Sequence, residues 1–413
     1  MPALRALARG RAPGQVVIQF TDRCNAACVQ CGMRVSNRFE RTTMRVDAVR
    51  NLLDAMAARG IMAVSFTGGE PLLHVDDVAA CMRHAGQAGI RHIRTGTNGF
   101  MFKGAHRADF ADRVHRLAET LAATPLSTFW ISIDSADPET HEQNRGLPGV
   151  VRGIEKALPI LARHGIHPSA NLGLNRLMGG RGAIPMPGQA CDASVFQDAC
   201  ERALDRFYAF VRELGFTIAN CCYPMSHDGD APDGDAIYAA TSSNAFIRFS
   251  PTERAALYRA LSAVVPRHRH RLRVFTPRSA LLALARDLEN PGRPVSRPCR
   301  GGKDFFFIDA ATMHAFPCGY RGAEDLGPFE ALDTASLPEP DCRRCDWECF
   351  RDPSELFGPI SDFFGSPIRL SARLLRDRIY AGTWFEDMRY YRACDYFNAR
   401  VPPDLDRLAR FRA

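Results

Sequence analysis

The sequence is poor in lysine and has no long hydrophobic run. Only three of its 53 basic residues are lysines (Lys103, Lys156 and Lys303), and the other 50 are arginines. No apolar run approaches the roughly 18 residues that a membrane span needs, and the Arg- and Ala-rich first 15 residues lack the apolar core of a secretory signal. These absences argue against a membrane protein and predict a cytoplasmic one.

The charge balance is mildly basic, with a formal net charge of +7. An arginine excess is typical of anion recognition, because guanidinium groups pair bidentately with carboxylates and phosphates. The simpler explanation, which we favour, is a proteome rich in Ala, Arg and Gly that uses arginine codons widely. The one dense basic run contains Arg267, His268, Arg269, His270, Arg271 and Arg273. A run this short predicts a solvated face, so nucleic acid is not an expected partner.

Cysteine is more informative than charge. The 413 residues contain 14 cysteines and no secretory signal, which favours metal or redox chemistry over disulfides. Three of them, Cys24, Cys28 and Cys31, lie within eight residues. Five more lie within 51 residues near the other end: Cys299, Cys318, Cys342, Cys345 and Cys349. The spacing therefore indicates two separate cysteine sites.

Between residues 15 and 223 short β-branched runs alternate with helix-length amphipathic segments, a pattern that predicts βαβ units and a parallel sheet. Gly60, Gly89, Gly165 and Gly215 each stand where a helix should end and a strand begin. The expected strands are 16–20, 61–66, 92–97, 128–134, 167–172 and 216–221. The expected helices are 46–59, 75–88, 106–123, 150–164 and 193–214. The predicted fold class is α/β, with six parallel strands in an open sheet or a partial barrel.

The rest of the chain divides by composition. Residues 15–223 form the predicted core, and residues 224–290 an insert with helices at 251–265 and 278–288. Residues 291–352 form a small cysteine-rich unit with a β-hairpin, and residues 353–413 a helical tail. The stretches 175–190 and 224–250 read as long irregular loops, which are uncommon unless functional or disordered.

The first three cysteines occupy a single loop after the first strand. In a parallel sheet this places them at the C-terminal edge, where α/β proteins bind their ligands. Three thiolates can hold three irons of a cubane cluster and leave the fourth iron open, whereas electron-transfer clusters use four. The triplet alone also fits a zinc site.

Further motifs follow in order along the strands. Thr67-Gly68-Gly69-Glu70-Pro71 comes after the second strand, Thr97-Asn98-Gly99 after the third, and Ser132-Ile133-Asp134 lies on the fourth. Together with the CxxxCxxC loop they resemble the radical S-adenosylmethionine (radical SAM) superfamily. The resemblance covers residues 16–221 and implies a partial (β/α)6 TIM-like barrel. It implies that Gly68, Gly69 and Glu70 contact the methionine amino group, Asn98 lies near the nucleoside, Ser132 and Asp134 reach the ribose, and Arg145 pairs with the methionine carboxylate.

The same resemblance implies the chemistry. Cys24, Cys28 and Cys31 would be the catalytic cluster ligands, S-adenosylmethionine would be cleaved reductively, and a 5′-deoxyadenosyl radical would remove a hydrogen atom from the substrate. The fifth strand's usual adenine-contact motif is only loosely matched by residues 171–175.

The distal cysteines resemble the twitch or SPASM-like extension of that superfamily, which holds an auxiliary [4Fe–4S] cluster. Two thiols flank a predicted hairpin and a CxxC follows, so zinc is the alternative from spacing alone. The expected ligands are Cys299, Cys318, Cys342 and Cys345, with Cys349 as a spare or a replacement. The glycine usual in the hairpin turn is Met313 here.

The sequence thus predicts a radical SAM enzyme with two [4Fe–4S] clusters that oxidises, or forms a bond at, an unactivated carbon. Because only about fifteen residues precede the first strand, too few for a leader-binding domain, a small-molecule substrate is favoured over a ribosomally made peptide. The expected partners are S-adenosylmethionine, an organic substrate and an electron donor such as flavodoxin or ferredoxin. A non-catalytic iron–sulfur or zinc protein is the alternative of another class. The sequence leaves the role of Cys221 and Cys222 open.

Overall fold

The computed structural model describes residue 7 and residues 11–31, 40–189, 191–223, 244–334 and 336–412. Seven strands follow one another in chain order across one sheet, and every neighbouring pair among them is parallel. They are β1 (Gly14–Thr21), β2 (Ile61–Gly68), β3 (His92–Thr97), β4 (Leu126–Ser132), β5 (Ser169–Gly173), β6 (Ile218–Cys222) and β7 (Arg273–Phe275). No helix among the described residues is long and apolar enough to cross a membrane.

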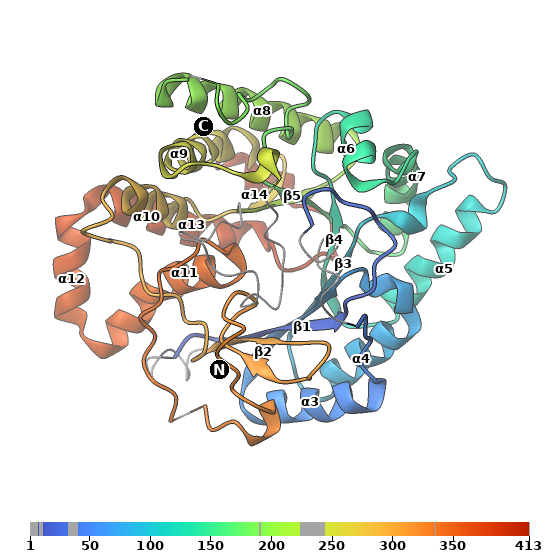
Figure 1. Ribbon diagram of the computed structural model, residues 1–413, viewed down its shortest axis with the longest axis horizontal. Coiled ribbons are helices and arrows are strands. Elements are labelled where there is room, and N and C mark those ends of the chain that lie inside the picture. Colours follow the sequence, from blue (N-terminus) through green and yellow to red (C-terminus); the bar gives the residue numbers. More distant parts are fainter. Residues whose placement is uncertain are drawn as a thin grey trace.

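Helices surround the strands (Figure 1). They are α3 (Val46–Ala58), α4 (Val75–Gln87), α5 (Phe110–Ala122), α7 (Val150–Arg163), α8 (Ala193–Glu213), α9 (Pro251–His268) and α10 (Arg278–Glu289). Each follows the strand of its βα unit and buries an apolar face; in α7 this face includes Ile154, Ala157 and Leu161 at helical spacing. Shorter 3₁₀ turns lie at Pro71–His74 (η1), Phe100–Phe102 (η2), Ala245–Ile247 (η3) and Phe329–Ala331 (η4).

The predicted helix-ending glycines have the backbone that such ends require. Their φ angles are 77° at Gly60, 95° at Gly89, 67° at Gly165 and 104° at Gly215, all in the region that disfavours a Cβ atom. The unclosed parallel sheet ringed by helices confirms the predicted partial barrel. The sequence interpretation missed β7 and the helix α6 (Pro138–Arg145).

The cysteine-rich unit joins the other edge of the sheet. Strand β8 (Phe305–Ile308) runs parallel to β1, with Gln15 opposite Phe305 and Ile18 opposite Ile308, and β9 (Ala315–Phe316) pairs antiparallel to β8. The predicted hairpin therefore extends the barrel sheet. Its turn contains Met313 at φ 59°, so a non-glycine residue takes the left-handed conformation at this position.

The C-terminal tail is helical, as predicted, and crosses the N-terminal ends of the strands. It contains α11 (Glu348–Gly365), α12 (Pro367–Arg376), α13 (Arg378–Cys394) and α14 (Leu405–Ala409). Ala399 O accepts a hydrogen bond from His167 N at 2.7 Å, and Ala399 N donates to Ser127 O at 2.8 Å. Arg273 donates to the carbonyls of Asn398 and Val401, both at 2.8 Å. The segment between α13 and α14 thus lies at the N-terminal ends of β4, β5 and β7, opposite the cysteine loop.

The first of the two predicted long loops is held in place by one buried side chain. Arg176 is fully buried and donates to both carboxylate oxygens of Glu253, at 2.8 and 2.9 Å, and to the carbonyl of Arg248. Glu253 is also the capping-box partner of Ser250 at the start of α9. The loop after β5 is therefore tied to α9. Of the second predicted loop, and of the predicted insert, residues 224–243 lie outside the described residues.

Candidate active site

The loop that carries the first three cysteines leaves the C-terminal end of β1 and is held by hydrogen bonds to the end of α6 and to Thr42. Ala27 N and Val29 N donate to the carbonyls of Arg145 and Asn144, at 2.8 and 3.1 Å, at the end of α6. Asp22 accepts from Thr42 N at 2.6 Å. Cys24 is exposed, and Cys28 and Cys31 are half-buried. The three thiols therefore stand on a fixed loop that remains accessible.

Gly68 and Gly69 pack against this loop. Gly69 N donates to Thr21 O at 2.7 Å, and Glu70 N donates to Arg23 O at 2.8 Å. A Cβ atom on Gly68 would overlap the carbonyl oxygen of Thr21, and one on Gly69 would overlap that of Arg23. Gly68 also has φ 135°. The two glycines thus let the end of β2 approach the cysteine loop, a backbone partner that the sequence did not reveal.

Glu70 links the ends of β2 and β3. It is 1% exposed, and its carboxylate accepts from Asn98 N at 2.6 Å and from Leu72 N at 3.1 Å. Burial raises the pKa of Glu70 to about 7, and the hydrogen bonds from Asn98 and Leu72 oppose that rise. In this structure Glu70 positions Asn98 and η1. Contact with a methionine amino group remains a prediction for this residue.

Asn98 extends this network to the cysteines. Its Nδ2 donates to Asn25 Oδ1 at 3.0 Å and lies 3.7 Å from Cys24 Sγ, while its Oδ1 accepts from Phe100 N. The predicted third motif therefore contacts the first one directly.

Asp134 and Arg145 form a bidentate ion pair, with distances of 2.7 and 2.8 Å between the guanidinium and the carboxylate. Gln30 Nε2, from the cysteine loop, also donates to Asp134 at 2.9 Å. Burial opposes ionisation of Asp134, but the neighbouring Arg145 outweighs it and holds the pKa of Asp134 below its usual value. Two predicted cofactor contacts thus bind each other beside Cys28, while Ser132 lies half-buried at the end of β4.

The environment of the cysteine loop favours protonated thiols in the protein alone. Partial desolvation of the sulfur raises the pKa of Cys24, and burial raises that of Cys28 to about 11. Metal binding must therefore release protons from these residues. No group of three or more His, Cys, Asp or Glu side chains among the described residues is already gathered around one point as for a single metal ion.

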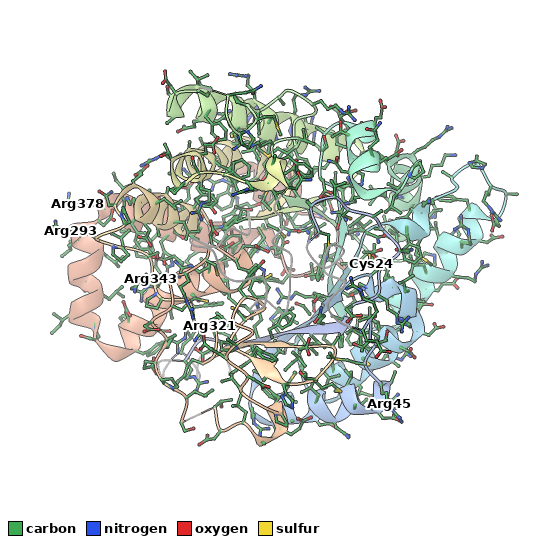
Figure 2. All side chains as sticks on the ribbon, viewed as in Figure 1. Cys24, Arg45, Arg293, Arg321, Arg343 and Arg378 are labelled. Atoms are coloured by element: carbon green, nitrogen blue, oxygen red, sulfur yellow. The ribbon has the colours of Figure 1, made fainter. Side chains whose placement is uncertain are left out.

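The distal cysteines line a separate cavity. Cys299, Cys318, Cys342 and Cys345 face it together with Trp347 and Phe350. The four thiols come from three segments, and Cys299 N donates to Cys342 O at 2.8 Å, which ties two of these segments together. Burial raises the pKa of Cys318 to about 12. Figure 2 shows Cys24 to the right and Arg321, which also lines the distal cavity, at the lower left, so the two cysteine sites are well separated.

Cys349 does not line that cavity. Its Sγ lies 3.4 Å from Glu348 Oε1, and Glu348 Oε2 accepts from Tyr223 N at 3.3 Å. The Cys222 thiol, at the end of β6, donates to Asn171 Oδ1 at 3.2 Å and also approaches Glu348. Cys221 points the other way, with its Sγ 3.4 Å from the Tyr208 hydroxyl in the core. Glu348 thus lies buried between two thiols, an arrangement that the sequence interpretation missed.

Residues 18–183 match the radical SAM superfamily. The matched segment is therefore a radical SAM domain. Members of that superfamily use a [4Fe–4S] cluster and S-adenosylmethionine, so the predicted resemblance and these two cofactors are confirmed. The match covers the segment from β1 to the loop after β5, which contains the Cys24–Cys31 loop and all the residues that contact it through the ends of β2, β3 and α6.

Relatives of this radical SAM chain differ in how much of it they share. An AdoMet-dependent heme synthase of Methanosarcina barkeri is 22% identical over 85% of this chain and 88% of its own length. A GTP 3′,8-cyclase of Actinobacillus succinogenes is 31% identical, but over 34% of this chain and 40% of its own length. The structure of Streptococcus suis SuiB bound to S-adenosylmethionine covers 78% of this chain and 65% of SuiB, with a TM-score of 0.50 and 16% identity. This similarity to SuiB supports the partial-barrel fold of the chain.

Proposed function

We propose that this protein is a two-cluster radical SAM enzyme that oxidises, or forms a bond at, an unactivated carbon of a biosynthetic small molecule. The proposal is supported above all by the distal cavity, where four thiols from three segments face one another on the strand that extends the radical SAM sheet. Cys24, Cys28 and Cys31 would hold the first [4Fe–4S] cluster, and Cys299, Cys318, Cys342 and Cys345 the auxiliary one.

When bound, the first cluster and S-adenosylmethionine supply a 5′-deoxyadenosyl radical, which is the species that removes hydrogen from the substrate. The chain's part is to orient these groups. Three cysteines on one accessible loop would hold three irons of a cubane cluster and would leave the fourth without a protein ligand. We assign the Arg145 guanidinium to the methionine carboxylate: Nε and Nη2 bind Asp134, and Nη1 makes no hydrogen bond within the described part of the chain.

The inner faces of β3 to β6 favour a substrate chamber inside the barrel. Several side chains on these faces are partly exposed, although their neighbours along the same strands are buried. A Cβ atom on Gly173 would meet nothing within 4 Å. The inward residues are polar or aromatic: Arg94, Trp130, Asn171, Asn220 and Cys222. Such a chamber suits a compact polar substrate. The heme synthase relative, aligned over most of both chains, also makes a small molecule.

Glu348 is the candidate proton acceptor in this chamber. It is buried, contacts Cys222 and Cys349, and lies three residues after Cys345 of the distal cavity. Burial raises the pKa of Glu348, which moves it toward the range suited to proton transfer near neutral pH. For a net two-electron oxidation the substrate loses a hydrogen atom, a proton and an electron. Glu348 would take the proton, and Cys299, Cys318, Cys342 and Cys345 would hold the cluster that supplies an electron acceptor.

The test is anaerobic reconstitution followed by iron and sulfide analysis and a dithionite-dependent assay for 5′-deoxyadenosine. We expect about eight irons per chain and cleavage of S-adenosylmethionine. Cys24→Ala should abolish cleavage and leave about four irons. The matched control Cys81→Ala changes a buried thiol on α4 that packs in the core, and it should keep both. Zinc in place of iron, or no cleavage with any reductant, would refute the proposal.

A further inference from the structure

The dense basic run predicted as a solvated face divides into two parts in the structure. Arg269 and Arg273 turn inward: Arg269 is 4% and Arg273 1% exposed, and they bind Glu386 and the carbonyls of the C-terminal tail. The other members, Arg267, His268, His270 and Arg271, line a surface cavity of about 410 Å³. Two members of the run therefore hold the C-terminal tail in place, and four line the cavity.

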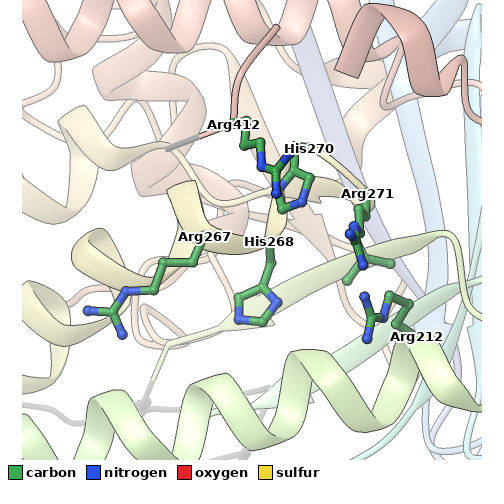
Figure 3. A pocket seen from close by; sticks show the side chains of 7 residues that line it. Arg212, Arg267, His268, His270, Arg271 and Arg412 are labelled. Carbon is green, nitrogen blue, oxygen red and sulfur yellow. The ribbon is translucent and has the colours of Figure 1, made fainter. Parts of the chain in front are cut away.

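Two more arginines complete this cavity from distant segments. Arg212 comes from the end of α8 and Arg412 from the end of the tail after α14. Figure 3 shows Arg212 and Arg271 extending toward each other, and Arg412 beside His270. Among the described residues, none that lines the cavity is acidic.

The positive charge of this cavity is only partly neutralised. Arg267 pairs with Glu201 and Asp205, at 2.5 and 2.6 Å, and His268 pairs with Asp205 at 2.8 Å. Arg212, Arg271 and Arg412 make no side-chain hydrogen bond or ion pair with any described residue. Burial lowers the pKa of His270, and Arg271, Arg412, His268 and Arg212 lower it further, so all these groups lie within electrostatic range of one imidazole. Three unmatched guanidinium groups thus surround one hollow.

We infer that this cavity binds a compact multiply charged phosphate anion, of the size and charge of pyrophosphate or the phosphate tail of a nucleotide. Guanidinium groups recognise phosphate oxygens bidentately, and three free ones match the charge of a diphosphate better than that of a single carboxylate. The volume lies within the range of small-molecule sites. The cationic groups enclose a hollow and do not form a stripe along the surface, which favours a small anion over a nucleic acid backbone.

This site is separate from the radical chemistry. It lies where α8 leads into β6 and α9 into β7, at the N-terminal ends of the strands, whereas the cysteine loop lies at their C-terminal ends. Anion binding in this cavity is therefore independent of the proposed function, and this binding can be measured without the substrate of the radical reaction.

The test is calorimetric titration of the full-length protein with inorganic pyrophosphate at low ionic strength. We expect one site per chain and at least about tenfold weaker binding in Arg212→Gln/Arg271→Gln, which removes two charge-assisted contacts. Arg116→Gln/Arg152→Gln removes the same charge from exposed positions on α5 and α7 and should bind as the natural sequence does. Thermal unfolding should be the same for all three proteins, because the four arginines are exposed.

Two results would overturn the inference. Equal loss of binding in both double variants would show a general charge effect without a site. Absence of pyrophosphate binding, with or without binding of a duplex oligonucleotide, would rule out a small-anion cavity.

Discussion

The two cysteine sites of this protein are built in opposite ways. The first places three thiols on one short loop, leaves Cys24 exposed, and fixes the loop through backbone hydrogen bonds to β2 and α6. The second gathers four thiols from three segments around a cavity, with Cys299 and Cys318 each 6% exposed behind Trp347 and Phe350. An accessible loop suits a cluster that must bind S-adenosylmethionine, and an enclosed cavity with four ligands suits one that only transfers electrons.

The largest effect is expected at the enclosed site. Cys318→Ala removes a ligand that no other thiol facing the cavity can replace. Iron should fall from about eight to about four per chain, and the folded state should lose most of the stabilisation that cluster binding provides. Cleavage of S-adenosylmethionine should survive, because the first loop is intact. Iron analysis and 5′-deoxyadenosine assay of the same preparation measure both. Loss of all iron would show that the two sites do not assemble separately.

The next effect concerns the ion pair beside the first loop. Arg145→Gln leaves the buried Asp134 carboxylate without its partner, which costs about 3–5 kcal/mol in the free energy of unfolding. S-adenosylmethionine binding should weaken as well. Arg152→Gln, on the exposed side of α7, is the control and should change neither quantity. Denaturant unfolding and equilibrium binding separate the two effects, and an Arg145→Gln protein as stable as the control would contradict the role of the pair.

A smaller effect is expected from a single methyl group. Gly69→Ala places a Cβ atom against the carbonyl of Arg23, so the cysteine loop must shift, at a cost of about 1–3 kcal/mol. Iron should be lost selectively from the first site. Gly382→Ala in α13 is a matched control with open space around it and should be neutral or slightly stabilising. Iron content and thermal unfolding of the two alanine variants are compared directly. Equal iron content would refute the packing role of Gly69.

The smallest effect on iron is expected at Cys349. This thiol contacts Glu348 and does not line the distal cavity, so Cys349→Ala should retain about eight irons. If its iron content falls to that of Cys318→Ala, then Cys349 is a ligand and the distal cavity rearranges on cluster binding. Spectroscopy of the reduced auxiliary cluster in both variants gives an independent measure.

Sequence predicted most of the barrel because its elements carry strong local signals. The amphipathic period of α7 identified it as a helix, and the glycines after the helices indicated where each helix ends. Helix α6 was missed because it buries only Thr140 and His141 and has no apolar stripe. Its Asp137 N-cap, Pro138 at the first turn and Gly146 at its end were signals that could have found it. Strand β7 was missed because its three residues begin in the basic run.

The candidate site was predictable in its residues but not in its contacts. The order of motifs placed Gly69, Glu70, Asn98 and Asp134 at one edge of the sheet. That Gly69 packs on the cysteine loop, or that Asp134 pairs with Arg145, depends on three-dimensional proximity, which no local pattern encodes. Glu348 lacks any signal, since its position between Cys222 and Cys349 arises only when the distal unit meets the end of β6.

The pairing of β1 with β8 has a consequence for how the chain is made. Gln15 and Phe305 are partners across about 290 residues, so a ribosome working at roughly 5–20 residues per second needs roughly 15–60 s between the two. Throughout that interval β1, the strand that leads into the first cysteines, presents an unpaired edge on a nascent chain. Such edges template aggregation. Protection by a chaperone, or late insertion of iron, would therefore matter most during synthesis.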